Sequence, residues 1–166
     1  KVLLTDNFQP KVAEILQQAD ENSKLLFLCS PNNPSGNSFT SDKVAELLNK
    51  FNGLVVIDEA YIDFSEEKSW LERLEEYPNL IVTQTLSKAY GLAGIRLGVC
   101  YASPEIISVL NKIKPPYNVN ELTQQKAIAR LEKVDEVNNE ITKIKAQRNH
   151  LLDELKKINF IEKIYP

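Results

Sequence analysis

Short runs of apolar residues recur along the first two thirds of the chain and indicate a β-sheet. Residues 25–29 (LLFLC), 54–57 (LVVI) and 80–83 (LIVT) are each of strand length and nearly free of polar positions. Such runs are typical of strands buried on both faces of a parallel sheet. We expect a fourth strand at residues 97–102 and a short strand-like segment at residues 1–5.

Apolar residues at helical spacing separate these runs. The pattern predicts helices over residues 10–18, from a cap at Thr40 or Ser41 to residue 49 or 50, over residues 65–77, and from Pro104 to just before Pro115. The third is an amphipathic surface helix with many acidic residues, and we expect its Trp70 in the core. Strand-like runs that alternate with helices indicate an α/β fold.

The last third of the chain is helical by period. Between residues 118 and 159 there is no glycine and no proline, and apolar residues recur at helical spacing. A single helix of that length would be unusual, and Asp135 can cap a new start. We therefore expect two helices that meet near residues 132–136, followed by a strand at residues 159–164. His150, the only histidine, is expected as a solvated helix residue, which argues against histidine-based triads and metal sites.

Composition is that of a soluble globular protein. The 166 residues, 43% hydrophobic and 26% charged, suffice for one hydrophobic core. The chain has 20 lysine and arginine residues and 23 aspartate and glutamate residues, which gives a net charge of -3. Because there is no excess of basic residues, we expect no nucleic-acid partner. No apolar run approaches the roughly 20 residues that cross a bilayer, and no signal peptide is evident, so we expect no membrane association. Cys29 and Cys100 lie in apolar runs, where buried free thiols are common, and this favours a reducing, cytoplasmic setting.

The densest group of reactive residue types follows the third apolar run. Thr85, Ser87 and Lys88 stand there, and Arg96 lies a short distance on. A lysine amine attacks aldehydes when burial or a neighbouring cation favours its neutral form, and Arg96 could be that cation. Arg96 could also bind a phosphate, to which Thr85 and Ser87 would donate hydrogen bonds. The alternative is that Lys88 and Arg96 are ordinary surface cations.

Further candidates follow the first two apolar runs. Ligands of open α/β sheets bind beyond the carboxyl ends of the strands, where Asn33, Asp58 and Tyr61 are expected. Asp58 would be costly directly after an apolar run unless a cation meets it. Taken singly, Asn33 could close a proline-bounded turn, Asp58 could be an N-cap or loop carboxylate, and Tyr61 could be a packed aromatic. Glu59 and Asp63 are expected to be surface or hinge acids.

Four blocks carry a more specific pattern when they are taken together. They are residues 30–37 (SPNNPSGN), 55–64 (VVIDEAYIDF), 85–98 (TLSKAYGLAGIRLG) and 115–120 (PPYNVN). In this order they resemble blocks of the fold-type I pyridoxal-phosphate enzymes, and among these the histidinol-phosphate aminotransferase family. The resemblance implies a three-layer α/β/α core with a mostly parallel sheet, in which residues 97–102 form one antiparallel strand.

The resemblance also implies a role for each candidate residue. Lys88 would bind the aldehyde of pyridoxal 5'-phosphate covalently and then act as general base and acid. Asp58 would keep the ring nitrogen protonated, and Asn33 and Tyr61 would hold the ring oxygen. The phosphate would be bound by residues of the lysine segment, namely Thr85, Ser87 and Arg96.

The implied activity is ping-pong transamination in histidine biosynthesis. Histidinol phosphate and 2-oxoglutarate would give imidazole-acetol phosphate and glutamate, so the partners would be a small-molecule amino donor, a 2-oxo acid and a second subunit in a homodimer. Two enzyme alternatives are a threonine-phosphate decarboxylase-like protein and another class I/II aminotransferase. A third alternative is the non-catalytic effector domain of a transcription regulator, against which the intact set of Asp58, Tyr61, Lys88 and Arg96 argues.

The same resemblance divides the chain near residue 134. Residues 1–134 would be part of the cofactor-binding large domain, and residues 135–166 would be the connector helix and the start of the small domain. The chain begins at Lys1 without an initiator methionine and ends in a strand-like segment, so we expect a fragment of a longer protein. Alone it is expected to be inactive, because the resemblance implies a helix N-terminus for the phosphate, an aromatic that stacks on the ring and a second subunit, all of which would lie outside it.

Overall fold

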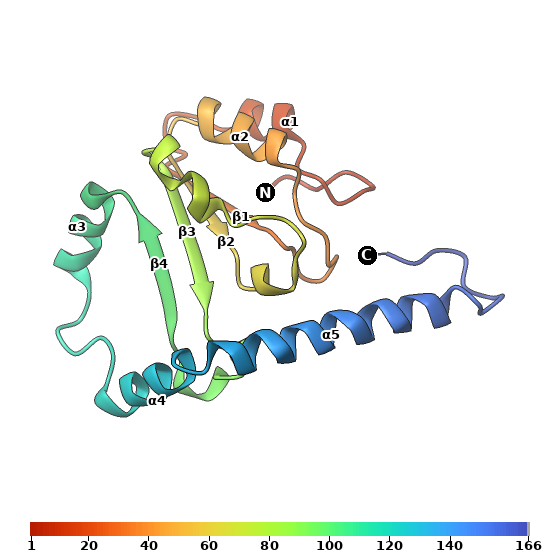
Figure 1. Ribbon diagram of the computed structural model, residues 1–166. Helices are drawn as coiled ribbons and strands as arrows, with labels where there is room; N and C mark the ends of the chain where they lie inside the picture. Colours follow the sequence, from red (N-terminus) through yellow and green to blue (C-terminus); the bar gives the residue numbers. More distant parts are fainter. Residues whose placement is uncertain (166) are drawn as a thin grey trace.

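The computed structural model describes residues 1–165 and is built around a four-stranded sheet (Figure 1). β1 (Leu25–Cys29), β2 (Leu54–Asp58) and β3 (Leu80–Thr85) are parallel neighbours in that order. β4 (Gly98–Ala102) pairs with β3 in the antiparallel direction. The four principal strands and the single antiparallel pair are therefore confirmed.

Helices lie over the sheet and beyond one of its ends (Figure 1). The α-helices are α1 (Val12–Gln18), α2 (Ser41–Lys50), α3 (Pro104–Ile113), α4 (Glu121–Leu131) and α5 (Val134–Leu155). The 3-10 helices are η1 (Ile62–Phe64), η2 (Trp70–Glu76) and η3 (Ala93–Ile95). The expected break near residues 132–136 is confirmed between α4 and α5. The helix expected at residues 65–77 is instead the shorter η2, which begins after Ser69 because that side chain accepts the N–H of Leu71.

The hydrophobic core lies between α1, α2 and one face of the sheet. Val44, Leu47 and Leu48 of α2 stand at helical spacing and are buried together, because they share one face of the helix. The strand side chains buried in the same cluster are Leu28, Val55, Ile57, Leu80 and Val82. Trp70 joins this core, as expected. Truncating a side chain as completely enclosed as Leu47 to alanine would cost about 2–5 kcal/mol.

β1 is covered on one face only, so the prediction of a strand buried on both faces was wrong. Leu28 is 5% exposed, whereas Leu25 is 54% and Phe27 is 69% exposed. Alternate side chains point to opposite faces of a strand, and no helix of residues 1–165 covers the second face of this edge strand. Cys29 and Cys100 are exposed as well, which corrects the expectation that both thiols are buried.

Neither end of the described chain extends the sheet. Residues 1–5 form no strand and lead into a turn in which the N–H of Phe8 donates to the carbonyl of Thr5. The strand expected at residues 159–164 is absent, because within residues 1–165 that segment has no neighbouring strand to pair its backbone groups.

α5 is a long polar helix that passes the end of the sheet at which β3 terminates (Figure 1). Its single buried residue is Val137 in the first turns, and His150 is exposed as expected. In the part of the chain that the structure describes, no helix combines the length and apolar character needed to cross a membrane.

Candidate active site

The carboxyl ends of the three parallel strands carry the predicted site residues. Asp58 ends β2, and in register it pairs with Cys29 at the end of β1 and with Thr83 in β3. Asn33 lies in the loop after β1, and Lys88 lies in the loop after β3. Parallel strands end at the same edge of a sheet, so these loops meet there.

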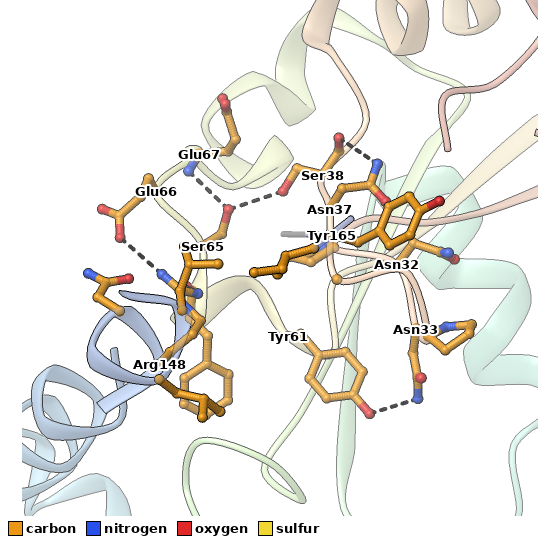
Figure 2. Close-up of a pocket in the computed structure, with 18 of the residues that line it drawn as sticks. Asn32, Asn33, Asn37, Ser38, Tyr61, Ser65, Glu66, Glu67, Arg148 and Tyr165 are labelled. Atoms are coloured by element: carbon orange, nitrogen blue, oxygen red, sulfur yellow. Dashed lines mark hydrogen bonds and ion pairs between the residues drawn. The ribbon is translucent and has the colours of Figure 1, made fainter. Parts of the chain in front are cut away.

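Asn33, Tyr61 and Lys88 come together although they belong to three separate segments. The amide Nδ2 of Asn33 donates to the hydroxyl of Tyr61 at 3.3 Å (Figure 2). The amine Nζ of Lys88 lies 5.1 Å from the centre of the Tyr61 ring, within cation–π range. An amide and an amine therefore both approach the same phenol.

Asp58 is partly buried, and each of its carboxylate oxygens has a partner. Oδ1 accepts the backbone N–H of Ala60 at 3.0 Å, and Oδ2 accepts the thiol of Cys29 at 3.8 Å. Partial desolvation of the sulfur, the charge of Asp58 and this hydrogen bond raise the pKa of Cys29, so the thiol keeps its proton and remains a donor. No lysine, arginine or histidine of residues 1–165 forms an ion pair with Asp58. The carboxylate is therefore open to a cationic ligand.

The remaining candidates lie where β3 turns into β4. The hydroxyl of Thr85 accepts the backbone N–H of Ser87 at 3.1 Å and donates to the carbonyl of Leu97 at 3.3 Å. Lys88 is exposed. The hydroxyls and the amine thus share one turn.

Arg96 has a left-handed backbone, with φ of 56°, which is uncommon for a residue with a side chain. Its Nη1 donates to the carbonyl of Ala93 at 2.9 Å, and within residues 1–165 its guanidinium has no other hydrogen bond. Arg96 and Lys88 lie on the same hairpin. Within residues 1–165, no hydrogen bond joins their two side chains. Backbone strain of this kind tends to persist where a ligand is bound.

Glu59 is buried at 1% exposure, so the prediction of a surface or hinge acid was wrong. Its carboxylate accepts the hydroxyl of Ser69 at 2.6 Å, the backbone N–H of Trp70 at 2.7 Å and the amide of Gln84 at 2.9 Å. These bonds tie the end of β2 to η2 and β3. Sequence reasoning missed this role because the three donors lie far along the chain, although an acid directly after a buried strand was a signal.

Asp63 is half-buried, and burial raises the pKa of its carboxyl. It lies near Tyr90 in the lysine loop, where burial and the charge of Asp63 raise the pKa of the phenol. The expectation of a surface position for Asp63 is therefore corrected as well.

A cleft of about 760 Å³ opens beside Asn33 and Tyr61 (Figure 2). The proline-rich loop after β1, residues 64–67 and, from α5, Arg148 and Leu152 line the cleft. A space of this size next to the amide and the phenol can admit a small-molecule ligand.

Comparisons with known proteins cover almost the whole chain. The sequence profile of aminotransferase class I and II matches residues 1–165. A histidinol-phosphate aminotransferase of Flavobacterium johnsoniae is 65% identical over 166 residues, which are 100% of this chain and 48% of that protein. The chain spans about half the length of the curated relatives it matches.

Solved structures share the arrangement of elements. The histidinol-phosphate aminotransferase of Clostridium acetobutylicum has a TM-score of 0.86 and 25% identity, over 98% of this chain and 50% of that chain. The enzyme of the same name from Sinorhizobium meliloti, in complex with pyridoxal-5'-phosphate, has a TM-score of 0.81 and 29% identity, over 91% of this chain and 42% of that chain.

Proposed function

The chain belongs to the class I and II aminotransferases, and we propose that it forms the cofactor-binding part of an enzyme that transfers the amino group of histidinol phosphate to 2-oxoglutarate. Its α/β core is that of the fold-type I aminotransferases. The observation that carries the proposal is the convergence of Asn33, Tyr61 and Lys88 at the edge of the sheet where β2 ends in Asp58, a carboxylate without an ion pair within residues 1–165.

The donors at the strand ends fit the ring of pyridoxal 5'-phosphate. Asp58 would hold the ring nitrogen, since a partly buried carboxylate without a cation favours a protonated partner. Asn33 and Tyr61 would donate to the ring oxygen, because their amide and hydroxyl already approach each other at 3.3 Å. The amine of Lys88 would take the aldehyde, which explains its place beside the Tyr61 ring.

The phosphate would be bound where β3 turns into β4. The guanidinium of Arg96 uses one N–H group on Ala93, which leaves its other donors for phosphate oxygens. Thr85 and Ser87 lie on the same hairpin and would add hydroxyl donors, for which Thr85 would turn its O–H away from the carbonyl of Leu97. Together these groups offer the phosphate one positive charge and several hydrogen-bond donors.

Once the amino substrate is bound, the protein's own contribution is positioning and proton transfer. Pyridoxal phosphate supplies an electron-withdrawing ring that makes the substrate α-proton acidic. The Nζ of Lys88 would remove that proton and return it as general base and acid. Asp58 would maintain the positive charge on which the withdrawal depends.

The relatives support histidinol phosphate as the amino donor, because three of them, at 58–65% identity, are histidinol-phosphate aminotransferases. They do not favour a threonine-phosphate decarboxylase-like enzyme or a regulator's effector domain. Transamination would run in two half-reactions, with 2-oxoglutarate as the acceptor in the second.

The wider organisation forms part of the same proposal. Residues 1–134 would belong to the large domain, and residues 135–166 would connect it to a smaller one, since the long helix α5 begins at Val134. The active unit would be a cytoplasmic homodimer. The 166 residues alone would be inactive, because they span about half the length of their relatives.

The test uses the complete product of the gene that carries this chain. Purified with pyridoxal phosphate, it should form glutamate from histidinol phosphate and 2-oxoglutarate. Release of carbon dioxide from threonine phosphate, with no glutamate formed from histidinol phosphate, would instead favour the decarboxylase. Absence of both reactions in a protein that holds the cofactor would contradict an enzymatic role for these substrates.

A further inference from the structure

One face of α4 is attached to the loop that carries Lys88 and Arg96. Thr123, Ala127 and Arg130 follow one another at helical spacing, and Thr123 and Ala127 are buried. The hydroxyl of Thr123 donates to the carbonyl of Ile95 at 3.3 Å. The Nε of Arg130 donates to the carbonyl of Tyr90 at 3.1 Å. The two bonds hold the loop shortly after Lys88 and directly before Arg96.

The loop needs such support because its own structure is sparse. Between Lys88 and Arg96 two backbone bonds are short turns, from Gly91 to the carbonyl of Lys88 and from Ile95 to that of Leu92. One longer bond, from the N–H of Leu92 to the carbonyl of Leu86, ties the loop to the residue that follows β3. Gly91 has φ of 69° and Arg96 has φ of 56°, so the segment bends twice through the left-handed region. A loop of this kind has low local stability unless neighbouring elements fix it.

Arg130 also reaches the start of α5. Its side chain is 18% exposed and pairs through Nη2 with Glu140, while Nη1 lies 3.9 Å from Glu136. Both acids are on the first turns of α5, next to the buried Val137. One guanidinium therefore joins the lysine loop, the end of α4 and the start of α5.

α5 is attached to the other half of the site further along its length. The Nη1 of Arg148 donates to the carbonyl of Phe64 at 2.9 Å, and the Nζ of Lys145 donates to that of Ser65 at 3.0 Å. Both side chains also pair with Glu66, and Figure 2 shows the pair of Arg148 with Glu66 at the mouth of the cleft. This segment follows Tyr61 through η1. α5 therefore spans from the Tyr61 side of the site to the Lys88 side.

We propose that Arg130 is a positioning residue that fixes the Lys88 loop against α5, and thereby sets the place of the Lys88 amine relative to Tyr61. The inference rests on the proposed function, in which Lys88 is the reacting amine. Lysine cannot replace Arg130 fully, because only the planar guanidinium reaches Tyr90 and Glu140 from one side chain. A change in α5 would be transmitted to Lys88 through this residue.

The test compares Arg130→Met and Arg130→Lys in the complete gene product. Hydrogen exchange of the peptide that covers residues 86–96, measured without cofactor, should speed up about tenfold or more in Arg130→Met, the effect of losing one hydrogen bond from a charged donor. With cofactor, kcat should fall about 100-fold with little change in KM, since a displacement of about 1 Å at a reacting group has that effect. Arg130→Lys should lie between the wild type and Arg130→Met in both measurements.

Arg73→Met is the matched control. Arg73 also pairs with a carboxylate, that of Glu76, and lies over the Trp70 ring, so its loss lowers stability at a place remote from Lys88. It should leave the exchange of residues 86–96 and kcat per folded molecule unchanged. If Arg130→Met does not fold, Glu140→Gln takes its place, because it removes the link to α5 and keeps the arginine.

Wild-type exchange of residues 86–96 in Arg130→Met, or an effect equal to that of Arg73→Met, would overturn the proposal. A wild-type protein without transaminase activity would refute the proposed function instead, and the exchange data would still decide whether Arg130 holds the loop.

Discussion

The two halves of the site are built by different means. Asp58 ends a strand whose preceding residues are buried, and sheet register with β1 and β3 sets its position. Lys88 and Arg96 stand on an exposed hairpin loop with two left-handed residues, and their position depends on contacts with α4. We call these the strand half and the loop half.

Because of this difference, substitutions in the two halves should affect the reaction and the stability of the fold to different degrees. Residues of the strand half share their anchors with the hydrophobic core, so a neighbour such as Glu59 can act on stability without touching a ligand. Residues of the loop half are exposed and contribute little to the core. Substitutions there should therefore alter the reaction far more than the folding.

Lys88→Ala should separate the two halves most sharply. The complete gene product should still bind pyridoxal phosphate through the groups for its ring and phosphate, but turnover should fall by about 10⁴-fold or more, as expected when a general acid–base group is lost. Stopped-flow measurement of the half-reaction with histidinol phosphate checks this. Lys112→Ala, on the exposed face of α3, is the control and should react normally. A Lys88→Ala enzyme within tenfold of wild type would refute the role of the loop half.

Asp58→Asn tests the strand half without changing its shape. The variant loses the negative charge that would face the ring nitrogen, so the rate of α-proton removal should fall about 10²–10³-fold, the usual cost of one electrostatic contact at a reacting centre. Cofactor affinity should fall much less. Single-turnover kinetics with α-deuterated substrate measures the step. Proton removal at near wild-type speed would mean that Asp58 does not support the ring.

Glu59→Gln should affect stability rather than chemistry, although Glu59 is adjacent to Asp58. The carboxylate of Glu59 accepts three hydrogen bonds. In Glu59→Gln the NH2 group of the amide would face one of these donors and could not accept its bond, so the free energy of unfolding should fall by about 2 kcal/mol. Denaturant unfolding of the holoenzyme checks the loss, and kcat per folded molecule should be retained. Glu72→Gln removes an exposed pair with Lys68 and should change stability by less than about 1 kcal/mol. Equal stability of the two variants would contradict the structural role of Glu59.

Cys29→Ala should have the smallest effect, and only at high pH. Partial desolvation of the sulfur and the charge of Asp58 raise the pKa of the Cys29 thiol above its ordinary 9.0, so the folded state holds the proton more tightly than the unfolded state. This contribution is complete below pH 9.0 and is lost as the pH rises above that value. The decline of Tm in alkaline buffer should therefore be shallower in Cys29→Ala than in wild type.

Cys100→Ala is the control. Desolvation alone raises the pKa of the Cys100 thiol, without a contribution from an acidic residue, so this substitution should change the slope less. Identical slopes in all three proteins would contradict the link to Asp58.

The sequence predicted the elements better than their surroundings. Two strands were predicted correctly from the apolar runs at residues 54–57 and 80–83. The buried face of α2 was predicted from the spacing of Val44, Leu47 and Leu48, because the period of apolar residues shows which face of a helix is buried. Exposure of Phe27 could not be predicted, because it depends on what covers the second face of the sheet. The strand expected at residues 159–164 is missing for the same reason, since pairing needs a neighbour that local sequence does not specify.

For the site, residue types and strand ends were predictable, whereas supporting contacts were not. Asn33 and Tyr61 were both expected near the ring, and they do form a pair. The bonds of Glu59 to Ser69 and Gln84, and of Arg130 to Tyr90, link segments far apart in sequence. No local pattern reports such bonds, because they depend on how the loops are placed in the folded chain.

The most direct measurement of the central claim is the attachment site of the cofactor. Borohydride reduction of the complete gene product loaded with pyridoxal phosphate should fix one cofactor per subunit, and peptide mapping by mass spectrometry should place it on Lys88. That result would identify the loop half as the site of the reacting amine. A label on Lys112 or another lysine, or no label on a protein that binds the cofactor, would contradict the account.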